Sequence, residues 1–236
     1  MIRKAVDLFF PPRCAGCDSL TDTDFPVCKS CRPLILNPAE KSKGCEICFL
    51  EPKDCICTKR QFYDKLSASF CYAGEPKRNI FRFKFHSRPD IARSYARLLY
   101  YSLERRDMLS DIDAITYVPM RKSAILKRGY NQSRLLALRL SEISGKPCID
   151  LLERISATEI QHSLHSSFRA GNLLGVFEPK KKHKEFIKGR KFLIVDDVYT
   201  TGSTFNEIAK TLLIFGAEGV YAAACTAVKK EKSIEQ

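Results

Sequence analysis

Apolar runs of strand length alternate with helical stretches over most of this chain. The predicted strands span 62–72, 113–120, 148–152, 192–195 and 219–227. The predicted helices span 75–88, 90–107, 131–144 and 208–215. Such alternation is typical of parallel sheets, because each crossover helix packs against a face of the sheet. The pattern predicts an α/β fold over residues 60–228: a mainly parallel sheet flanked by helices, with its ligand at the carboxyl edge.

The stretch 191–204 places two acids and a hydroxyl-rich loop between a strand and a helix. Asp196 and Asp197 follow the apolar run 192–195, where that strand is expected to end. The loop that follows consists of Thr200, Thr201, Gly202, Ser203 and Thr204. Thr204 and Glu207 have capping-box spacing, which predicts a helix start. Free N–H groups and the helix dipole favour phosphate at such a loop, and the two carboxylates suit ribose hydroxyls or Mg²⁺.

This segment resembles the ribose-5-phosphate-binding motif of type I phosphoribosyltransferases. The resemblance implies that Asp196 and Asp197 bind the ribose of phosphoribosyl pyrophosphate (PRPP) together with Mg²⁺, and that 200–204 holds its 5-phosphate. It also implies a pyrophosphate loop, formed by Pro119, Met120, Arg121 and Lys122. The alternative is an ordinary strand, loop and helix with a solvated acid pair. The polar stretch after residue 153 predicts a closing lid that includes Arg154, Thr158, Gln161 and Arg169.

Eight of the 11 cysteines are concentrated near the N-terminus in four close pairs. We predict zinc rather than disulfides, because the pairs repeat in a chain without a signal peptide. Sequential pairing gives one set of Cys14, Cys17, Cys28 and Cys31, and a second of Cys45, Cys48, Cys55 and Cys57. The second set departs from the two-residue spacing, so one or two zinc ions and an interleaved pairing stay open. Residues 1–60 are expected to form a zinc-ribbon domain, and 61–236 the larger domain.

Charge indicates a polyanionic partner. The chain has 40 Lys and Arg against 27 Asp and Glu, a formal net charge of +13. Nucleic acid, an anionic membrane face and a phosphorylated substrate all fit, as does a generally basic surface. The densest mixture of cations and Phe lies at 75–88, which predicts single-stranded DNA contacts by Lys77, Arg78, Arg82, Lys84 and Arg88. The alternative is an amphipathic helix with part of its Phe content in the core.

Targeting signals are weak. No apolar run approaches the length of a membrane span, and Asp7 interrupts the apolar N-terminal stretch. We therefore predict a cytoplasmic protein. Residues 1–10 suit a short amphipathic helix that docks on the protein or touches a membrane, and 179–191 suits a solvated basic loop.

The whole chain resembles the ComF (competence protein F) family. The resemblance rests on the cysteine pairs and on Arg82–Phe85, Val118–Pro119, Arg128–Gln132, the Arg154–Arg169 pattern and Val195–Thr204. It implies a role in natural transformation, in which incoming single-stranded DNA moves from the inner membrane into the cytoplasm. Partners in the DNA-uptake machinery at the inner membrane would follow from that role.

Three functions remain open at this point. The first is a DNA-uptake protein that binds PRPP and single-stranded DNA. The second is an active phosphoribosyltransferase acting on an unknown nucleophile. The third is a zinc-ribbon adaptor on a degenerate scaffold, which the intact acid pair and Thr-Thr-Gly loop disfavour. A glutamine-using amidophosphoribosyltransferase is disfavoured too, because Met1-Ile2 offers no N-terminal Cys.

Overall fold

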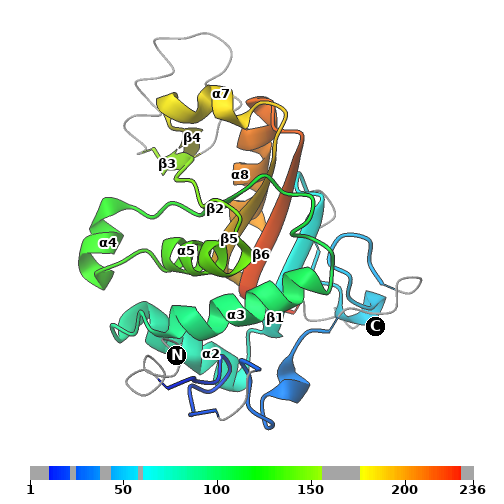
Figure 1. Ribbon diagram of the computed structural model, residues 1–236, viewed down its shortest axis with the longest axis vertical. Coiled ribbons are helices and arrows are strands. Elements are labelled where there is room, and N and C mark those ends of the chain that lie inside the picture. Colours follow the sequence, from blue (N-terminus) through cyan, green and yellow to red (C-terminus); the bar gives the residue numbers. More distant parts are fainter. Residues whose placement is uncertain (1–10, 22–24, 38–43, 58–60, 156–175, 230–236) are drawn as a thin grey trace, which may run out of the picture.

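The computed structural model describes residues 11–21, 25–37, 44–57, 61–155 and 176–229. The strands are β1 Lys65–Cys71, β2 Ala114–Tyr117, β3 Leu152–Arg154, β4 Phe177–Pro179, β5 Lys191–Tyr199 and β6 Gly219–Ala227. The α-helices are α2 Gly74–Phe85, α3 Ile91–Glu104, α4 Lys122–Arg128, α5 Gln132–Ser144, α7 Lys184–Ile187 and α8 Ser203–Ile214. Short 3₁₀ turns are η1 Arg32–Leu34, η2 Pro52–Asp54 and η3 Lys181–His183. Figure 1 shows one main sheet with helices packed around it.

The main sheet is parallel throughout. Its four strands lie in the order β1-β6-β5-β2, and every neighbouring pair runs in the same direction. β6 has the predicted bounds, and all of its residues are buried. Strands that are covered on both faces carry continuous apolar runs, so these strands could be predicted from the sequence. The predicted parallel α/β fold is confirmed.

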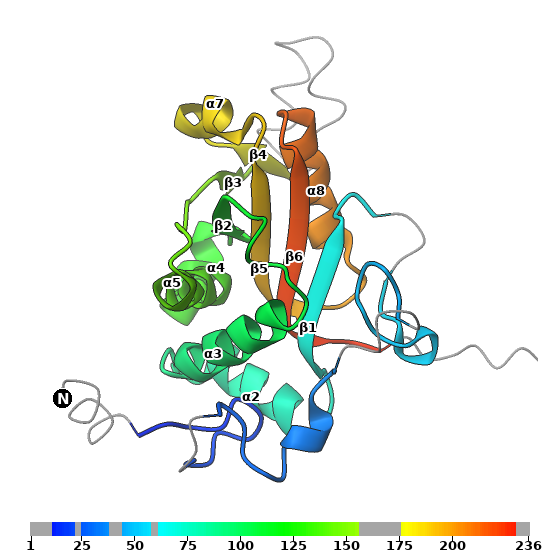
Figure 2. The same cartoon turned by 45° about the vertical axis from the view of Figure 1, so that its right-hand side comes forward.

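Helices cover the two faces of the sheet unequally. On one face, Leu193 and Val195 of β5 pack in a core with α3 and α5. On the other, Phe192 and Ile194 pack in a core with α8. The alternation follows from the strand geometry, which turns successive side chains to opposite faces. Figure 2 shows α3 and α5 on one side of the sheet and α8 on the other.

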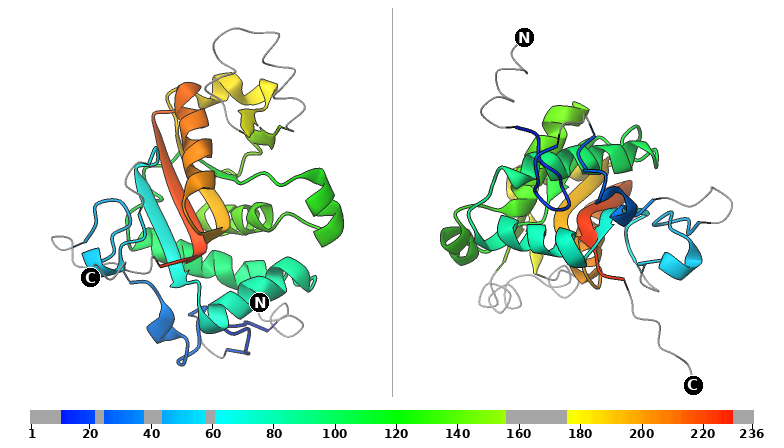
Figure 3. Two further views of the ribbon diagram at one scale, coloured as in Figure 1. Left: turned by 180° about the vertical axis from the view of Figure 1, so that it is seen from behind. Right: turned by 90° about the horizontal axis from the view of Figure 1, so that it is seen from below.

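Each cysteine-rich segment packs against a different face of the sheet. Cys14 and Cys31 lie in the core that contains Phe70 and helices α3 and α5. Cys48 lies in the opposite core with Leu66 and α8. Figure 3 shows the two segments at separate places around β1. The division into domains after residue 60 stays a prediction.

The same segments cover the outer edge of β1. The Leu36 N–H donates to the Ser69 carbonyl at 2.8 Å, and the Leu66 N–H donates to the Ile47 carbonyl at 2.8 Å. An uncovered edge strand would expose unpaired backbone groups to other chains. The cysteine segments therefore also complete the sheet.

β5 is longer than predicted. It continues through Asp196 and Asp197 to Tyr199, rather than ending at Val195. The acids stay in the strand because β6 pairs along this whole stretch, as in the register Asp196 with Ala224. The carboxylates consequently lie on rigid strand backbone instead of on a loop.

The start of α8 also differs from the prediction. The helix begins at Ser203, and the cap residue is Gly202 at φ 77°, so the predicted Thr204–Glu207 capping box is wrong. A Cβ at Gly202 would lie 2.5 Å from the Tyr199 hydroxyl. Both its left-handed backbone and this close approach require glycine.

Three connecting segments depart from the sequence-based expectation. The predicted basic loop at 179–191 contains η3 and α7, and the stretch after β2 contains α4. The predicted strand at 148–152 is reduced to a parallel bridge between Cys148 and Ile115. The strand after it, β3, pairs antiparallel with β4 in a separate small sheet. Residues 1–10, predicted to form a helix, lie outside the described residues.

Candidate functional site

The two acids of β5 are held by side chains from two helices. Ser133, at the start of α5, donates its hydroxyl to Asp196 Oδ1 at 2.6 Å. The Asp197 N–H donates to the same oxygen at 2.9 Å. Lys84, in the last turn of α2, lies with Nζ 2.8 Å from Asp197 Oδ1. The acid pair is thus fixed from three sides.

The acid pair is electrostatically strained. Removal from water and the neighbouring charge of Asp197 raise the pKa of Asp196 to about 7. The Asp197 side chain is 8% exposed and that of Lys84 22%, so little solvent screens this ion pair. Lys84 supplies the positive charge that stabilises the carboxyl group of buried Asp197 beside half-buried Asp196.

The segment 128–133 joins three parts of the site. The Tyr130 hydroxyl donates to the Phe83 carbonyl of α2. Asn131 Nδ2 donates to the Val118 carbonyl at 3.1 Å, at the end of β2. Asn131 Oδ1 also accepts from the Arg134 N–H at 3.2 Å and caps α5. In the sequence, this segment carries the family resemblance and places cations and a glycine just past a strand end, and Asn131 is the local signal for the cap of α5.

A cleft of about 420 Å³ opens above the acid pair. It brings together Asp196, Asp197, Thr200, Thr204, Pro119, Met120, Arg121 and Arg154 from the predicted site residues. Lys84, Arg128 and Ser133 also line it and were not predicted there. Carboxylates and cations that line one cleft suit a ligand that combines hydroxyl groups with phosphates.

Some predicted residues lie beside this cleft instead of lining it. Thr201 donates its hydroxyl to Ser203 at 3.0 Å, within the loop before α8. Gly202 shapes that loop through its positive φ. Lys122 begins α4 and is exposed. Of the predicted lid, Thr158, Gln161 and Arg169 lie outside the described residues.

The cysteines form two tetrads with sequential pairing. Within each tetrad the four sulfur atoms lie within 4.8 Å of one another, in the sets Cys14, Cys17, Cys28, Cys31 and Cys45, Cys48, Cys55, Cys57. Four thiols at this spacing could hold a tetrahedral zinc ion. The sequential pairing is confirmed, including the set with the shorter Cys55-x-Cys57 spacing.

Hydrogen bonds and charge distinguish the thiols in each tetrad. Backbone N–H groups of Gly16 and Cys28 each lie 3.3 Å from Cys14 Sγ, a position that stabilises a thiolate. Burial and the charge of Cys14 raise the pKa of Cys31. In the second tetrad, a hydrogen bond with Cys57 lowers the pKa of Cys48 to about 5. Four thiolates in this space require a cation.

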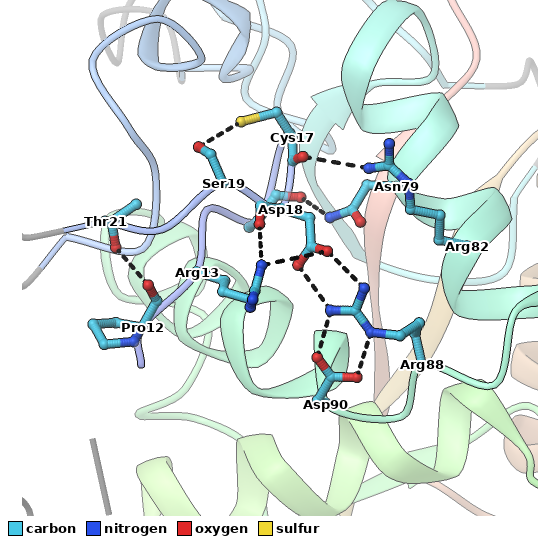
Figure 4. A network of polar contacts seen from close by, with 11 residues as sticks. Pro12, Arg13, Cys17, Asp18, Ser19, Thr21, Asn79, Arg82, Arg88 and Asp90 are labelled. Atoms are coloured by element: carbon cyan, nitrogen blue, oxygen red, sulfur yellow. Dashed lines mark hydrogen bonds and ion pairs between the residues drawn. The ribbon is translucent and has the colours of Figure 1, made fainter. Parts of the chain in front are cut away.

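The cations predicted to bind DNA have partners within the protein. Arg82 donates to the Cys17 carbonyl at 3.3 Å, and Arg88 Nη1 lies 2.8 Å from Asp18 (Figure 4). Arg78 pairs with Glu75. Lys77 lies 5.7 Å from the centre of the Tyr72 ring. The Arg82 and Lys84 contacts tie α2 to its surroundings, whereas the Arg78–Glu75 pair lies within the helix and Arg88 lies just after it. DNA binding by this set stays a prediction.

No helix in the part of the chain that the structure describes is long and apolar enough to cross a membrane.

The fold agrees with comparisons to known proteins. The phosphoribosyl transferase domain model matches residues 124–236. Competence protein F of Haemophilus influenzae is 32% identical over 212 residues, covering 88% of this chain and 86% of that protein. DNA utilization protein YhgH of Escherichia coli is 32% identical over 211 residues, with the same coverage of 88% and 86%. Competence protein ComFC of Streptococcus pneumoniae is 27% identical over 217 residues, covering 88% and 84%.

Proposed function

Because the chain belongs to the competence protein F family, we propose that it acts in DNA uptake by binding PRPP and single-stranded DNA. The names of its relatives, competence protein and DNA utilization protein, support the uptake role. The phosphoribosyl transferase domain match supports a PRPP-like ligand. The observation that carries the PRPP proposal is the Asp196–Asp197 pair, held by Lys84, in a cleft that cations also line.

Each part of the cleft has a proposed role in PRPP binding. Asp196 and Asp197 accept hydrogen bonds from the ribose hydroxyls and hold Mg²⁺ through carboxylate oxygens. The 200–204 loop, at the start of α8, offers backbone N–H groups to the 5-phosphate. The loop 119–122 takes the pyrophosphate, with Arg121 on the cleft wall. Arg154, together with the predicted lid residues beyond it, closes over the ligand.

Phosphoribosyl transfer to an unknown acceptor is the second candidate. The cleft offers the parts that such a transfer needs, namely acids for the ribose and Mg²⁺ and cations for the leaving pyrophosphate. Release of pyrophosphate from PRPP, measured with and without single-stranded DNA, separates transfer from binding alone. A steady release above the rate for a boiled sample supports the enzyme.

Each tetrad is proposed to bind one zinc ion. Thiolates are the preferred ligands of structural zinc, and bound zinc would neutralise the charge that the tetrads concentrate. We also propose a cytoplasmic location and contact with the DNA-uptake machinery at the inner membrane.

Titration calorimetry with PRPP and Mg²⁺ tests the PRPP site. We expect Asp196→Asn with Asp197→Asn to abolish the binding heat, because amides lose the charge that attracts Mg²⁺ and the ribose hydroxyls. The matched control is Glu142→Gln with Glu185→Gln, which removes two carboxylates that lie in exposed pairs with Arg139 and Lys188. Equal affinity in parent, acid-pair variant and control would refute the PRPP assignment.

A further inference from the structure

Two phenylalanines of α2 face solvent beside the cleft. Phe81 is 52% exposed and Phe85 53%, whereas Ile80 and Phe83 of the same helix are fully buried. The two exposed rings lie 4.9 Å apart between centroids, inclined by 46°. Their burial is therefore not what stabilises α2, and an exposed pair of aromatic rings points to a binding surface.

Cations beside these rings come from α4. The Arg128 guanidinium lies 5.0 Å from the centre of the Phe85 ring and also lines the cleft. Lys127 precedes it and is exposed, as are Arg121 and Lys122 at the start of the helix. Among the described residues, Lys122 and Lys127 form no ion pair, in contrast to Lys84 and Arg88 of the α2 region.

We propose that the last turn of α2 and helix α4 together bind single-stranded nucleic acid, with bases on Phe81 and Phe85 and phosphates on Lys127 and Arg128. Figure 1 shows these two elements on the same side of the molecule. The proposal rests on the proposed role in DNA uptake for the nature of the strand, and it names the surface that the strand occupies. In this proposal the phosphates contact cations of α4. The α2 cations Arg78, Arg82 and Lys84 already have partners within the protein.

Stacking explains why the strand is single. The π-face of a base is accessible in an unpaired strand and is covered by its neighbours in a duplex. Rings inclined to each other at 46° suit bases of a flexible strand. The cations give sequence-independent attraction, and the formal net charge of +13 adds long-range attraction for a polyanion.

The surface is continuous with the acid cleft. Arg128 contributes to both, because its guanidinium lies over Phe85 while its side chain lines the cleft. It also donates to Gln132 Oε1 at 3.3 Å, which fixes it between the two. A strand bound on α2 and α4 would therefore pass the mouth of the cleft, where a PRPP ligand would lie.

Fluorescence anisotropy with a labelled oligothymidylate of about 15 nucleotides tests the surface. We expect Phe81→Ala with Phe85→Ala to weaken binding about tenfold, with an unchanged salt slope, because stacking is not electrostatic. Phe81→Leu with Phe85→Leu keeps apolar bulk and should lose nearly as much. Lys127→Gln should lower the salt slope by about 0.7, as expected for one phosphate contact on a single strand.

Matched controls separate this surface from general effects. Ile143→Ala with Ile214→Ala removes two other exposed apolar side chains, and Lys181→Gln removes an exposed cation elsewhere. These controls should bind like the parent, and all variants should keep the parent's melting temperature and its PRPP binding. Controls that weaken binding as much as the α2 and α4 variants would overturn the assignment.

The remaining outcomes distinguish this inference from the proposed function. If the parent protein binds no oligothymidylate at low salt, the DNA role itself fails. If the parent binds and the Phe and Lys127 variants bind equally well, the role stands and this surface is wrong. If those variants lose binding to vesicles of anionic phospholipid and keep binding to the oligonucleotide, the surface is a membrane contact and the inference is overturned.

Discussion

The acid pair and the cysteine tetrads both concentrate negative charge, but they balance it in different ways. Asp196 and Asp197 carry their own counter-charge, since Lys84 lies 2.8 Å from Asp197. Each tetrad holds four sulfurs within 4.8 Å of one another, and four thiolates at that spacing need a metal cation to balance their charge. A site with its own cation can fold before its ligand arrives, whereas thiolates crowded together need a metal to fold at all.

Ligand binding in the cleft and metal binding in the tetrads therefore have different effects on the structure. A ligand that enters the cleft meets a formed site and competes with Lys84 for Asp197. Zinc that enters a tetrad joins chain segments that contain little core of their own. The comparison indicates that metal removal should act on folding, and that changes in the cleft should act mainly on binding.

Zinc removal should give the largest effect. Each structural zinc site contributes on the order of 10 kcal/mol to the folding of its segment. We therefore expect metal analysis to find two zinc ions per chain, and chelation to unfold both segments and expose the core around Cys14 and Cys48. Thermal unfolding with and without chelator measures the loss. One zinc per chain would show that a tetrad does not close.

Removing the internal cation of the cleft should have the next largest effect. Lys84→Met leaves Asp197 buried without its partner, which should cost about 3 kcal/mol of unfolding free energy. Urea unfolding measures this cost. The double variant Lys84→Met with Asp197→Asn should recover most of it, because no charge is then left unpaired. A Lys84→Met protein as stable as the parent would mean that the acid pair does not depend on Lys84.

The protonation of Asp196 should produce a smaller, pH-dependent effect. Its folded pKa lies near 7, above its ordinary value, so the folded state binds this proton more tightly than the unfolded chain. Protonated Asp196 therefore stabilises the folded state relative to the unfolded chain. This stabilisation is complete below about pH 4 and is lost as the pH rises through about 7. Asp196→Asn removes this loss, so the variant should gain stability relative to the parent as the pH rises through about 7.

Urea unfolding at about pH 4.5 and about pH 8 checks the sign. The difference in stability between variant and parent should grow with pH. A constant difference would mean that Asp196 is ionised throughout this range.

The contact between the α2–α3 loop and the first cysteine segment should give the smallest effect. Arg88 pairs with Asp18 and Asp90, and its side chain is 32% exposed. Arg88→Gln should cost at most about 1 kcal/mol, because solvent screens partly exposed ion pairs. Zinc content and PRPP binding should not change. A loss of zinc in this variant would show that the first tetrad depends on the α2–α3 loop as well as on metal.

The sheet and the cysteine pairing could be predicted from the sequence, because both depend on patterns among residues close together in the chain. Strand β6 has its predicted bounds, and the tetrads follow the order of the Cys pairs. The Asp196–Asp197 motif marked the carboxyl side of β5 for the same reason.

Contacts between segments that are distant in the chain could not be predicted from the sequence. Lys84 looked like a DNA-binding cation, since nothing in its neighbourhood along the chain reveals that Asp197 lies 2.8 Å away. The cation–π contact of Arg128 with Phe85 also joins separate helices. β5 extends past the predicted end because of pairing with β6, and α4 begins at Lys122, inside the stretch expected to form the pyrophosphate loop. Each of these features depends on contacts with residues that are distant in the sequence.

The strand order has a consequence for synthesis on the ribosome. In the order β1-β6-β5-β2, the two strands made last lie between the two made first. β1 and β2 therefore cannot pair with each other when they emerge from the ribosome. The sheet is complete only after β6 has left the exit tunnel. The cysteine segments precede all of these strands in the chain, so they can capture metal while the rest is still being translated. A nascent chain halted before β5 would hold zinc and lack the cleft.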